Sequence, residues 1–537
     1  MTEPRHILSQ LSAAASDHPT RPSVISRGTV LSFRDLEEQS NQCASGLRFH
    51  GVERGTRVVM LVRPGIEFVT ISFALVKLGA IAVFVDPRMG RQNLSRCLEE
   101  VRFDAFIGSL RANIARVVLG WGRDSNKLCI NVSRVKAPGV LSYEEIMRHG
   151  QMAQPLAAAD PDQVAAVVFT SGSTGTPKGV VYTHRMFSAQ VASLAESFQI
   201  RSGEVDLTTF PLFALFNPGL GMTTVFPDID FTRPGKVDPN TLVKCIRVHN
   251  ATHMFGSPAL LDRLGRFGER RGGTLPSMRR VLVAGAPASI RTLRALRTFL
   301  KPEAEIHCCY GATEALPICS ISGRDLLAET FTEPEKGSCL GLPIKGVKLA
   351  VVKVVDGPIK AWCDDLLVNS GEVGELVAGG ANVSHSYWNR RENDLTKIEM
   401  TGGTVLHRMG DLGYIDERGH VWFCGRKSQR IVTSSGTLYT VPCEGVFDQH
   451  PRVRRSALIG VGQPPNQLPV LCVELENRSH KRELARIKRE LFSMAERYPH
   501  LRQIESILFH PGFPVDARHN AKIIREQLSI WAAKRIS

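Results

Sequence analysis

The 537-residue sequence lacks any apolar run long enough to cross a bilayer. Its longest apolar runs, such as VVMLV at residues 58–62 and AIAVFV at residues 80–85, have the length of strands. A helix that spans a membrane needs about 20 such residues. The first thirty residues also lack the apolar core of a secretory signal peptide. We therefore expect a cytoplasmic protein without a transmembrane segment.

Cysteines with the spacing of a zinc or redox site are missing as well. None of the 12 cysteines forms a Cys-x-x-Cys pair. Scattered thiols favour a reducing compartment over a disulfide framework or a metal site. The adjacent Cys308 and Cys309 are interpreted as small buried hydrophobic residues.

Acidic residues are in short supply, because 52 Asp and Glu stand against 67 Lys and Arg, which gives a formal net charge of +15. Such an excess can attract nucleic acid, but no zinc-finger spacing and no RNA-binding aromatic motif accompany it. Residues 480–490, HKRELARIKRE, intersperse Glu among the cations and predict a solvated helix face. We interpret the excess as general basicity that attracts anionic substrates or a partner surface, and we expect no nucleic-acid partner.

What the sequence does contain is a regular alternation of short apolar runs and longer helical segments. Residues 57–62 and 80–86 have the pattern of buried strands, and residues 65–79 between them have the pattern of a helix. Such alternation predicts an α/β fold with largely parallel sheets. Residues 343–357 and 371–380 look instead like β-hairpins of a small barrel-like part.

A chain of this length is expected to divide into more than one domain. Its composition turns basic after the segment WFCGRKSQR, and a new set of strands and helices begins there. The sequence therefore predicts a large domain at residues 1–425 and a small α+β domain at residues 426–537.

One polar stretch, TSGSTGTPKGVVYTH at residues 170–184, combines glycines, hydroxyl groups and a lysine. Glycine lets the backbone approach a ligand closely, and successive N–H groups can then surround an anion. Lys178 adds a positive charge, so the stretch predicts a phosphate-binding loop. It is not a Walker P-loop, which ends in Gly-Lys-Ser/Thr before a helix, because Pro177 precedes the lysine and a strand-like GVVY follows. A flexible turn rich in small residues is the simpler alternative.

The segment TSGSTGTPKGV resembles the phosphate loop of the adenylate-forming superfamily of acyl-CoA synthetases, luciferases and peptide-synthetase adenylation domains. Five further segments match motifs of that superfamily in the expected order: AGAP, YGATE, RMGDLGY, GRK and HNAKIIRE. The match covers nearly the whole chain. It implies ATP and Mg²⁺ as cofactors, an acyl-AMP intermediate, and a small C-terminal domain that rotates about a hinge.

The resemblance also implies roles for single residues. In YGATE, Thr313 would meet the α-phosphate, Glu314 would help to hold magnesium, and Tyr310 would stack near adenine. The implied catalytic residues are Lys522, Glu314, Thr313 and Lys178, and the implied metal ligands are Glu314 and Thr174. The implied nucleotide-binding residues are Thr170, Ser171, Gly172, Ser173, Thr174, Gly175, Thr176, Gly285, Ala286, Pro287, Tyr310, Gly311, Thr313, Asp411 and Arg426.

Several of these residues also have a plain structural interpretation. Asp411 would accept both ribose hydroxyls, as an ionised carboxylate can, or it could cap a turn in GDLG. Glu314 offers the hard oxygen that Mg²⁺ prefers, or it could be an acid at a helix start. Lys522 would be the late catalytic lysine, or it could be a lysine at the start of the terminal helix. Arg426 would lie at the ribose and hinge end of the large domain.

The sequence departs from many acyl-CoA ligases at three places. Ala214 stands where they carry a histidine, Ser428 takes a hinge position that is often Asp or Lys, and the ending reads PVDARHNAKII. The segments FPLFALFNPGLG, YGATEALPI, HRMGDLGY and RHNAKIIRE resemble instead the β-lactone synthetases of bacterial long-chain olefin pathways. That resemblance implies a long-chain 2-alkyl-3-hydroxy fatty acid as substrate, whose own hydroxyl attacks the adenylated carbonyl and expels AMP.

The residue that deprotonates this hydroxyl is not identified by the sequence. His184, His307 and His407 are candidates by residue type, although each is more often a structural histidine. Two other functions stay open: a fatty acyl-CoA or acyl-AMP ligase that passes the acyl group to an external thiol such as coenzyme A, and an inactive nucleotide-binding scaffold. The resemblance also suggests association with neighbouring enzymes of the olefin pathway.

Overall fold

The structure is a computed structural model that describes residues 6–122, 128–135, 138–151, 160–170, 177–328, 331, 333–388, 393–477, 479–515 and 523–536. Two parts of the predicted site, Ser171–Thr176 and Lys522, lie outside the described residues. None of the helices in these ranges is both long and apolar enough to cross a membrane.

The N-terminal part is built around a seven-stranded sheet in the order β7-β6-β5-β3-β4-β8-β9. All its pairs are parallel except β8 with β9 at one edge. The predicted strand–helix–strand unit is confirmed as β3 (Arg57–Leu61), α3 (Ile66–Leu78) and β4 (Ile81–Phe84). The remaining strands are β5 (Ala105–Gly108), β6 (Leu128–Asn131), β7 (Leu141–Ser142), β8 (Val164–Thr170) and β9 (Lys178–Thr183).

The helices of this part pack against the sheet or against one another. Helix α2 (Phe33–Phe49) begins with a capping box in which Ser32 and Asp35 bond each other's backbone N–H groups. Nearly every residue of α3 is buried, and the helix ends at Gly79, whose φ of +65° suits glycine. The other helices here are α1 (Ile7–Asp17), α4 (Arg91–Val101), α5 (Leu110–Val118), α6 (Tyr143–His149) and α7 (His184–Ser197).

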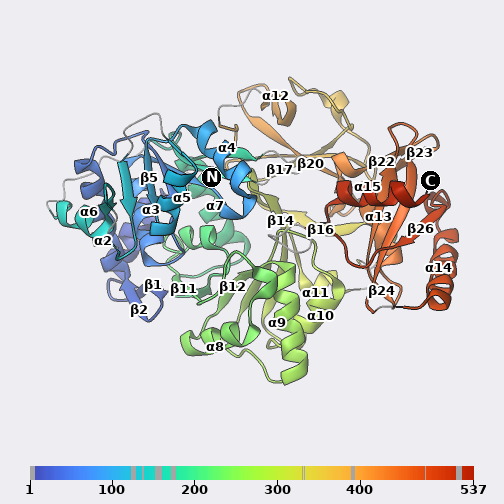
Figure 1. Cartoon of the computed structure of the whole chain (residues 1–537), viewed down its shortest axis with the longest axis horizontal. Helices are drawn as coiled ribbons and strands as arrows, with labels where there is room; N and C mark the ends of the chain where they lie inside the picture. Colours follow the sequence, from blue (N-terminus) through green and yellow to red (C-terminus); the bar gives the residue numbers. More distant parts are fainter. Residues whose placement is uncertain are drawn as a thin grey trace.

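A second sheet has 14 strands, which come from residues 22–426 (Figure 1). Its parallel half consists of β1 (Pro22–Ser26), β10 (Val205–Leu207), β11 (Thr223–Phe226), β12 (His253–Gly256), β13 (Arg280–Val283) and β14 (Glu305–Ala312), with β2 (Thr29–Ser32) antiparallel at the edge. Helices α8 (Pro239–His249), α9 (Pro258–Arg271) and α10 (Ile290–Thr298) belong to this half.

The antiparallel half of the same sheet contains the two predicted hairpin segments. Strand β17 (Lys348–Val352) pairs with β18 (Gly374–Gly379), which pairs with β20 (Val405–Ile415). The other strands are β15 (Ala315–Ser322), β16 (Ser338–Pro343), β19 (Lys397–Glu399) and β21 (Val421–Arg426). The two halves meet where β14 and β15 pair as a hairpin.

The C-terminal part follows β21 and has its own sheet of β24 (Val453–Val461), β25 (Leu468–Leu475) and β26 (Ser506–Phe509), shown in red in Figure 1. Helices α13 (Thr440–Phe447), α14 (Lys481–Glu496) and α15 (Arg525–Ile536) and the hairpin β22 (Ile431–Thr433) with β23 (Gly436–Leu438) complete it. Because the large sheet ends at Arg426, we propose the domain boundary there.

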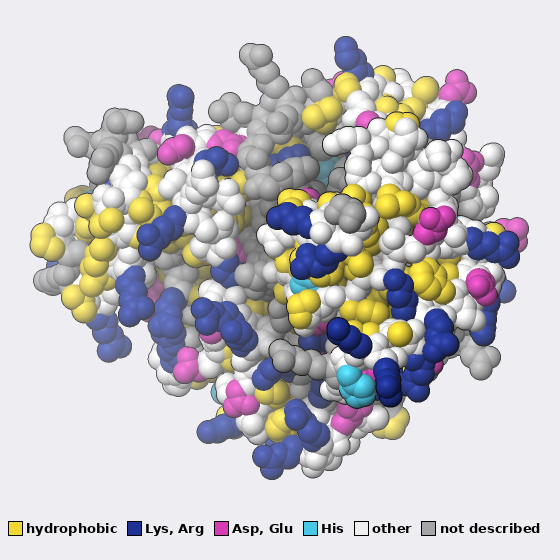
Figure 2. Space-filling model, turned by 45° about the vertical axis from the view of Figure 1, so that its right-hand side comes forward, with side chains coloured by type: hydrophobic (Ala, Val, Ile, Leu, Met, Phe, Trp, Pro, Cys, Tyr) yellow, Lys and Arg dark blue, Asp and Glu magenta, His cyan; other side chains and the backbone are white. Residues whose placement is uncertain are grey.

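The basic excess is distributed over the surface. Figure 2 shows Lys and Arg side chains spread over most of the visible face, with Asp and Glu among them. The predicted solvated helix is confirmed as α14, which buries Ile487, Leu491 and Ala495 and exposes most of its charged residues. Cys308 and Cys309 are half-buried, not fully buried as we expected, and burial raises the pKa of each thiol to about 12.

Candidate active site

Three neighbouring strands bring Tyr310, Asp411 and Arg426 together. Asp411 on β20 lies directly opposite Arg426 on β21 in the antiparallel pairing. The Tyr310 hydroxyl, on β14, donates to Asp411 Oδ2 at 2.6 Å, and Arg426 Nη1 lies 2.9 Å from Asp411 Oδ1. The three residues span positions 310–426 of the sequence. In the structure, the Tyr310 hydroxyl and the Arg426 guanidinium both contact the Asp411 carboxylate.

The electrostatics of this trio keep the Tyr310 hydroxyl protonated and the Arg426 guanidinium charged. Asp411 is 3% exposed, so its charge needs a partner. Burial opposes the charge of Arg426, but Asp411, Tyr310 and Glu314 together raise the pKa of the guanidinium. Burial and the Asp411 charge together raise the pKa of Tyr310 far above its usual value. An ionised carboxylate has about four acceptor positions, so Asp411 can accept ribose hydroxyls beside these donors.

The turn between β14 and β15 carries Thr313 and Glu314 and is fixed by three hydrogen bonds. The Tyr182 hydroxyl donates to the Thr313 carbonyl at 2.6 Å. The Ser384 backbone N–H donates to the Glu314 carbonyl at 2.7 Å. The Tyr387 hydroxyl donates to Glu314 Oε1 at 2.8 Å. The Glu314 carboxylate is thus oriented by a residue 73 positions later in the chain.

The ends of the phosphate-binding stretch are well defined. Thr170, the last residue of β8, pairs with Lys178, the first residue of β9. Thr170 and Lys178, which flank residues 171–176, therefore lie side by side at the β8–β9 edge of the sheet. Lys178 Nζ lies 5.3 Å from the centre of the Tyr387 ring, so the lysine and the Glu314 turn share this tyrosine as a neighbour.

The predicted adenine-side loop follows β13. Because β13 and β14 are parallel, their carboxyl ends lie at the same edge of the sheet, where ligands of open α/β sheets usually bind. Gly285 has a φ of +95°, which favours glycine, and Ala286 and Pro287 follow it. Of the predicted nucleotide-binding residues that are described, all lie on β8, β9, β13, β14, β20 or β21 or on the turns that follow them.

The described residues suit a magnesium ion that is shared with a nucleotide. No group of three or more His, Cys, Asp or Glu able to hold a metal occurs within the described part of the chain. Mg²⁺ typically takes one or two carboxylates and completes its shell with phosphate oxygens and water. Glu314 provides one such carboxylate with a fixed orientation; Thr174, the other predicted ligand, lies outside the described residues.

The three histidines considered as bases lie in different places. His307, near the start of β14, contacts Glu305 at 3.0 Å, and burial lowers its pKa. His184 begins α7 beside His6, and burial lowers its pKa to about 4. His407 on β20 is buried, and burial lowers its pKa far below the usual value. Burial thus keeps all three imidazoles neutral near pH 7, and the structure does not bring them together.

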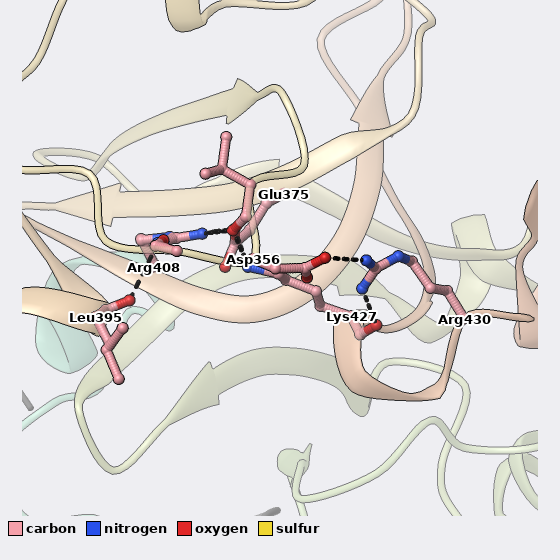
Figure 3. Close-up of polar contacts among 8 residues, drawn as sticks. Asp356, Glu375, Leu395, Arg408, Lys427 and Arg430 are labelled. Carbon is pink, nitrogen blue, oxygen red and sulfur yellow. Dashed lines mark hydrogen bonds and ion pairs between the residues drawn. The ribbon is translucent and has the colours of Figure 1, made fainter. Parts of the chain in front are cut away.

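The hinge region is held by a network of ion pairs (Figure 3). Glu375 on β18 is contacted by Arg408 Nη2 at 2.5 Å and by Lys427 Nζ at 3.1 Å. Three residues further on, Arg430 Nη2 contacts Asp356 Oδ2 at 2.6 Å. Lys427 and Arg430 flank the predicted hinge residue Ser428, so both sides of the hinge are tied to the large domain.

The sequence analysis did not find Tyr387, Lys397 or Tyr182. Tyr387 and Lys397 lie outside the motifs, and Tyr182 lies within residues 170–184 but was given no role; all three reach the site through contacts with distant parts of the chain. Lys397 Nζ lies 5.4 Å from the centre of the Tyr387 ring, and burial lowers the pKa of this lysine to about 7. Lys397 begins the short strand β19, whose sequence KIE gives no signal that the lysine is buried.

We expect Asp411→Asn to weaken binding of AMP by about 10- to 100-fold, because a hydrogen bond to a charged acceptor contributes about 1.5–3 kcal/mol. The amide retains the size of the side chain, so the change reports on charge and acceptor capacity. Isothermal titration calorimetry with AMP measures the effect. Asp416→Asn, at the end of the same strand, is the matched control, and an equal loss in both variants would contradict the assignment.

Known proteins resemble this chain over most of its length. A family model described as AMP-binding enzyme matches residues 11–388. The olefin beta-lactone synthetase of Xanthomonas campestris is 42% identical over 94% of this chain and 91% of its own length. The enzyme of the same name from Stenotrophomonas maltophilia is 41% identical over 100% of this chain and 99% of its own.

Solved structures agree with the fold. The amide bond synthetase McbA from Marinactinospora thermotolerans superposes with a TM-score of 0.79 at 21% identity, covering 98% of this chain and 99% of its own. The o-succinylbenzoate coenzyme A synthetase of Bacillus subtilis, solved in complex with ATP and magnesium ion, superposes with a TM-score of 0.75 at 22% identity, covering 97% and 98%. At these identities the likeness shows the fold alone.

Proposed function

Since the chain belongs to the family of AMP-binding enzymes, we propose that it adenylates a 2-alkyl-3-hydroxy fatty acid and closes the product to a β-lactone. The observation that carries this proposal is the identity of 41–42%, over nearly the whole chain, to two olefin beta-lactone synthetases. A fold-level likeness alone would not select a substrate, because one fold supports many acyl acceptors.

In the first step, a carboxylate oxygen of the acid attacks the α-phosphorus of ATP, and the bond to pyrophosphate breaks. Carboxylate and triphosphate repel each other, so the site must supply positive charge and backbone dipoles. Lys178, Lys522 and the N–H groups of residues 170–176 serve this purpose. A magnesium ion held by Glu314 and Thr174 would neutralise charge on the phosphates.

Asp411, Tyr310 and Arg426 hold the nucleotide during this step. Asp411 accepts the ribose hydroxyls, and Tyr310 and Arg426 fix the carboxylate from two sides. The loop with Gly285, Ala286 and Pro287 faces the adenine. The Thr313 hydroxyl donates a hydrogen bond to the α-phosphate. Gly311 lets β14 approach the start of β15 closely, because a Cβ there would lie 2.8 Å from the Ala315 carbonyl oxygen.

In the second step, the 3-hydroxyl oxygen attacks the adenylated carbonyl carbon and loses its proton, and the bond between that carbon and the AMP oxygen breaks. A nucleophile in the same molecule can reach effective concentrations of about 10⁵–10⁸ M, although strain in the four-membered ring offsets much of this advantage. No external thiol is required. Ala214 supports this because it is fully buried in the turn Pro211–Leu215 and cannot donate or accept a proton.

A small apolar cavity of about 40 Å³ lies near the proposed phosphate site. It lies between α1, α3, β4, β8 and α7, and its wall includes Tyr182, whose hydroxyl bonds the Thr313 carbonyl. The cavity therefore adjoins the turn that would meet the α-phosphate. Its apolar lining residues include Ile7, Phe73, Val76, Phe84, Phe187 and Leu215. This lining disfavours water, which would otherwise hydrolyse the adenylate, but a volume of about 40 Å³ does not hold a long alkyl chain.

The location and the partners of the protein are part of the same proposal. We propose a cytoplasmic location, because most of its 12 cysteines are buried small side chains and none forms a Cys-x-x-Cys pair, as expected in a reducing compartment. We further propose that it associates with neighbouring enzymes of the olefin pathway, on the strength of its similarity to olefin beta-lactone synthetases.

Mass spectrometry of the products tests the function. The protein is incubated with ATP, Mg²⁺ and a long-chain 2-alkyl-3-hydroxy acid, with and without coenzyme A. We expect β-lactone, AMP and pyrophosphate in both cases. The same acid without its 3-hydroxyl is the control, and it should form the adenylate but no lactone.

Two other results would each point to a different function. A thioester whose formation depends on coenzyme A would identify an acyl-CoA ligase. An absence of pyrophosphate with every hydroxy acid and simple fatty acid tested would indicate a nucleotide-binding scaffold without this activity.

A further inference from the structure

A short segment, residues 384–388, connects the strand after the phosphate loop with the turn that carries Glu314. The Trp388 backbone N–H donates to the Gly179 carbonyl at 2.7 Å, and the Val181 N–H donates to the Ser386 carbonyl at 3.1 Å. At its other end, the Ser384 N–H donates to the Glu314 carbonyl at 2.7 Å. The segment is therefore fixed to both parts of the phosphate site through its backbone.

Tyr387 lies in the middle of this segment and is 5% exposed. Its hydroxyl donates to Glu314 Oε1 at 2.8 Å, which fixes the carboxylate in one orientation. Hydrogen bonds to a charged acceptor are stronger than those between neutral groups. A carboxylate that is already oriented loses less conformational entropy when a cation binds. The hydrogen bond from Tyr387 should therefore favour binding of Mg²⁺ by Glu314.

Two lysines flank the ring of the same tyrosine. Lys178 Nζ lies 5.3 Å and Lys397 Nζ 5.4 Å from the ring centre, both within the range of cation–π attraction. Lys178 begins β9, directly after the phosphate loop, and Lys397 begins β19. The ring thus has two lysine side chains nearby and a carboxylate at its hydroxyl, an arrangement that suits a polyanion.

Lys397 is an unusual lysine because it is only 7% exposed and donates to a neutral acceptor, the Ser384 carbonyl. A buried ammonium without a close anion is costly. The charged and titratable groups around it are Glu314, Lys178, His385 and the neutral His407, which pairs with it across β19 and β20. Burial lowers the pKa of Lys397 to about 7, although Glu314 acts in the opposite direction.

We propose that Tyr387 and Lys397 are positioning residues for the triphosphate end of the site. Tyr387 orients the Glu314 carboxylate toward the metal-bound phosphates, and Lys397 holds the Tyr387 ring and the Ser384 carbonyl in place while adding positive charge. This rests on the proposed nucleotide site but not on the choice of acyl substrate. AMP lacks the β- and γ-phosphates, so its binding should not depend on either residue.

The test compares the binding of three ligands by isothermal titration calorimetry: ATP with Mg²⁺, ATP with EDTA, and AMP. For Tyr387→Phe we expect about a tenfold weaker affinity for ATP with Mg²⁺, as fits one lost hydrogen bond to a charged group. Affinities for AMP and for metal-free ATP should stay within about twofold. Tyr414→Phe is the matched control, because its hydroxyl bonds the Lys336 carbonyl away from the site.

For Lys397→Met we expect about a tenfold loss of affinity for ATP with and without Mg²⁺, and unchanged binding of AMP. Lys397→Arg, which retains the charge, should recover most of this affinity. The matched control is Lys77→Met, which removes another buried lysine, 6% exposed, on α3. If Lys397→Met does not fold, Tyr387→Phe still tests the contact with Glu314.

Two results would overturn the proposal. The first is an unchanged affinity of Tyr387→Phe for ATP with Mg²⁺. The second is an affinity for AMP that falls as much as the affinity for ATP in each variant. These measurements need no acyl acid, so a failure of the β-lactone proposal would not affect them. If the unmodified protein does not bind ATP, the proposed nucleotide site itself is wrong.

Discussion

Replacing Lys522 by alanine is expected to slow adenylation by about 10²- to 10³-fold, because the site would lose one preorganised cation at the reacting carboxylate and phosphate. Binding of ATP should change by no more than a few-fold, since the lysine acts where the two anions meet. Single-turnover release of pyrophosphate measures the rate, and calorimetry measures the affinity. Lys522 lies outside the described residues, so its role is inferred from the motif HNAKIIRE.

The matched control for this variant is Lys534→Ala, on the terminal helix α15 that follows. Lys534 lies in the last turn of that helix and belongs to none of the motifs, so its removal should leave the rate unchanged. Equal losses in the two variants would mean that general basicity of the C-terminal part matters. An unchanged rate in Lys522→Ala would remove this lysine from the catalytic residues.

Replacing Glu375 by alanine is expected to destabilise the large domain by about 3–5 kcal/mol, because it would leave a buried guanidinium without its anion. Arg408 is 2% exposed at its side chain and Glu375 is 3% exposed, so water cannot take the place of the lost partner. Lys427 would lose its partner in the same step (Figure 3). Thermal and urea unfolding, followed by near-UV circular dichroism, measure the loss.

The ion pair between Arg430 and Asp356 provides the control. The side chain of Asp356 is 71% exposed, so Asp356→Ala should change the stability by no more than about 1 kcal/mol. Glu375→Gln should fall between the two, because it retains the shape but loses the charge. If Glu375→Ala and Asp356→Ala shift unfolding equally, the buried network does not stabilise the hinge region as we describe.

Much of the fold could be predicted from local sequence patterns. The unit of β3, α3 and β4 was predicted because buried parallel strands are short and continuously apolar, and the helix between them is longer. The strand after Lys178 was predicted from GVVY and is confirmed as β9. The pairing of β17 with β18 agrees with the predicted hairpin segments.

The candidate site was predictable where a motif carries it and not elsewhere. Asp411 and Arg426 stand in motifs, and the antiparallel pairing of their strands places them opposite each other. Tyr387 and Lys397 stand in no motif, and their proximity to Glu314 depends on contacts between segments more than 70 residues apart. Local patterns do not encode such contacts. The roles assigned to the site residues stay predictions until variants are measured.

The central claim is that the carboxylate of the acid, and not its hydroxyl, is joined to AMP before the ring closes. The most direct test uses a 2-alkyl-3-hydroxy acid with ¹⁸O in both carboxyl oxygens. We predict one ¹⁸O in the phosphate of AMP and one in the carbonyl of the lactone, because the bond between the carbonyl carbon and the AMP oxygen breaks. AMP without ¹⁸O, together with a lactone that retains both labels, would contradict the account.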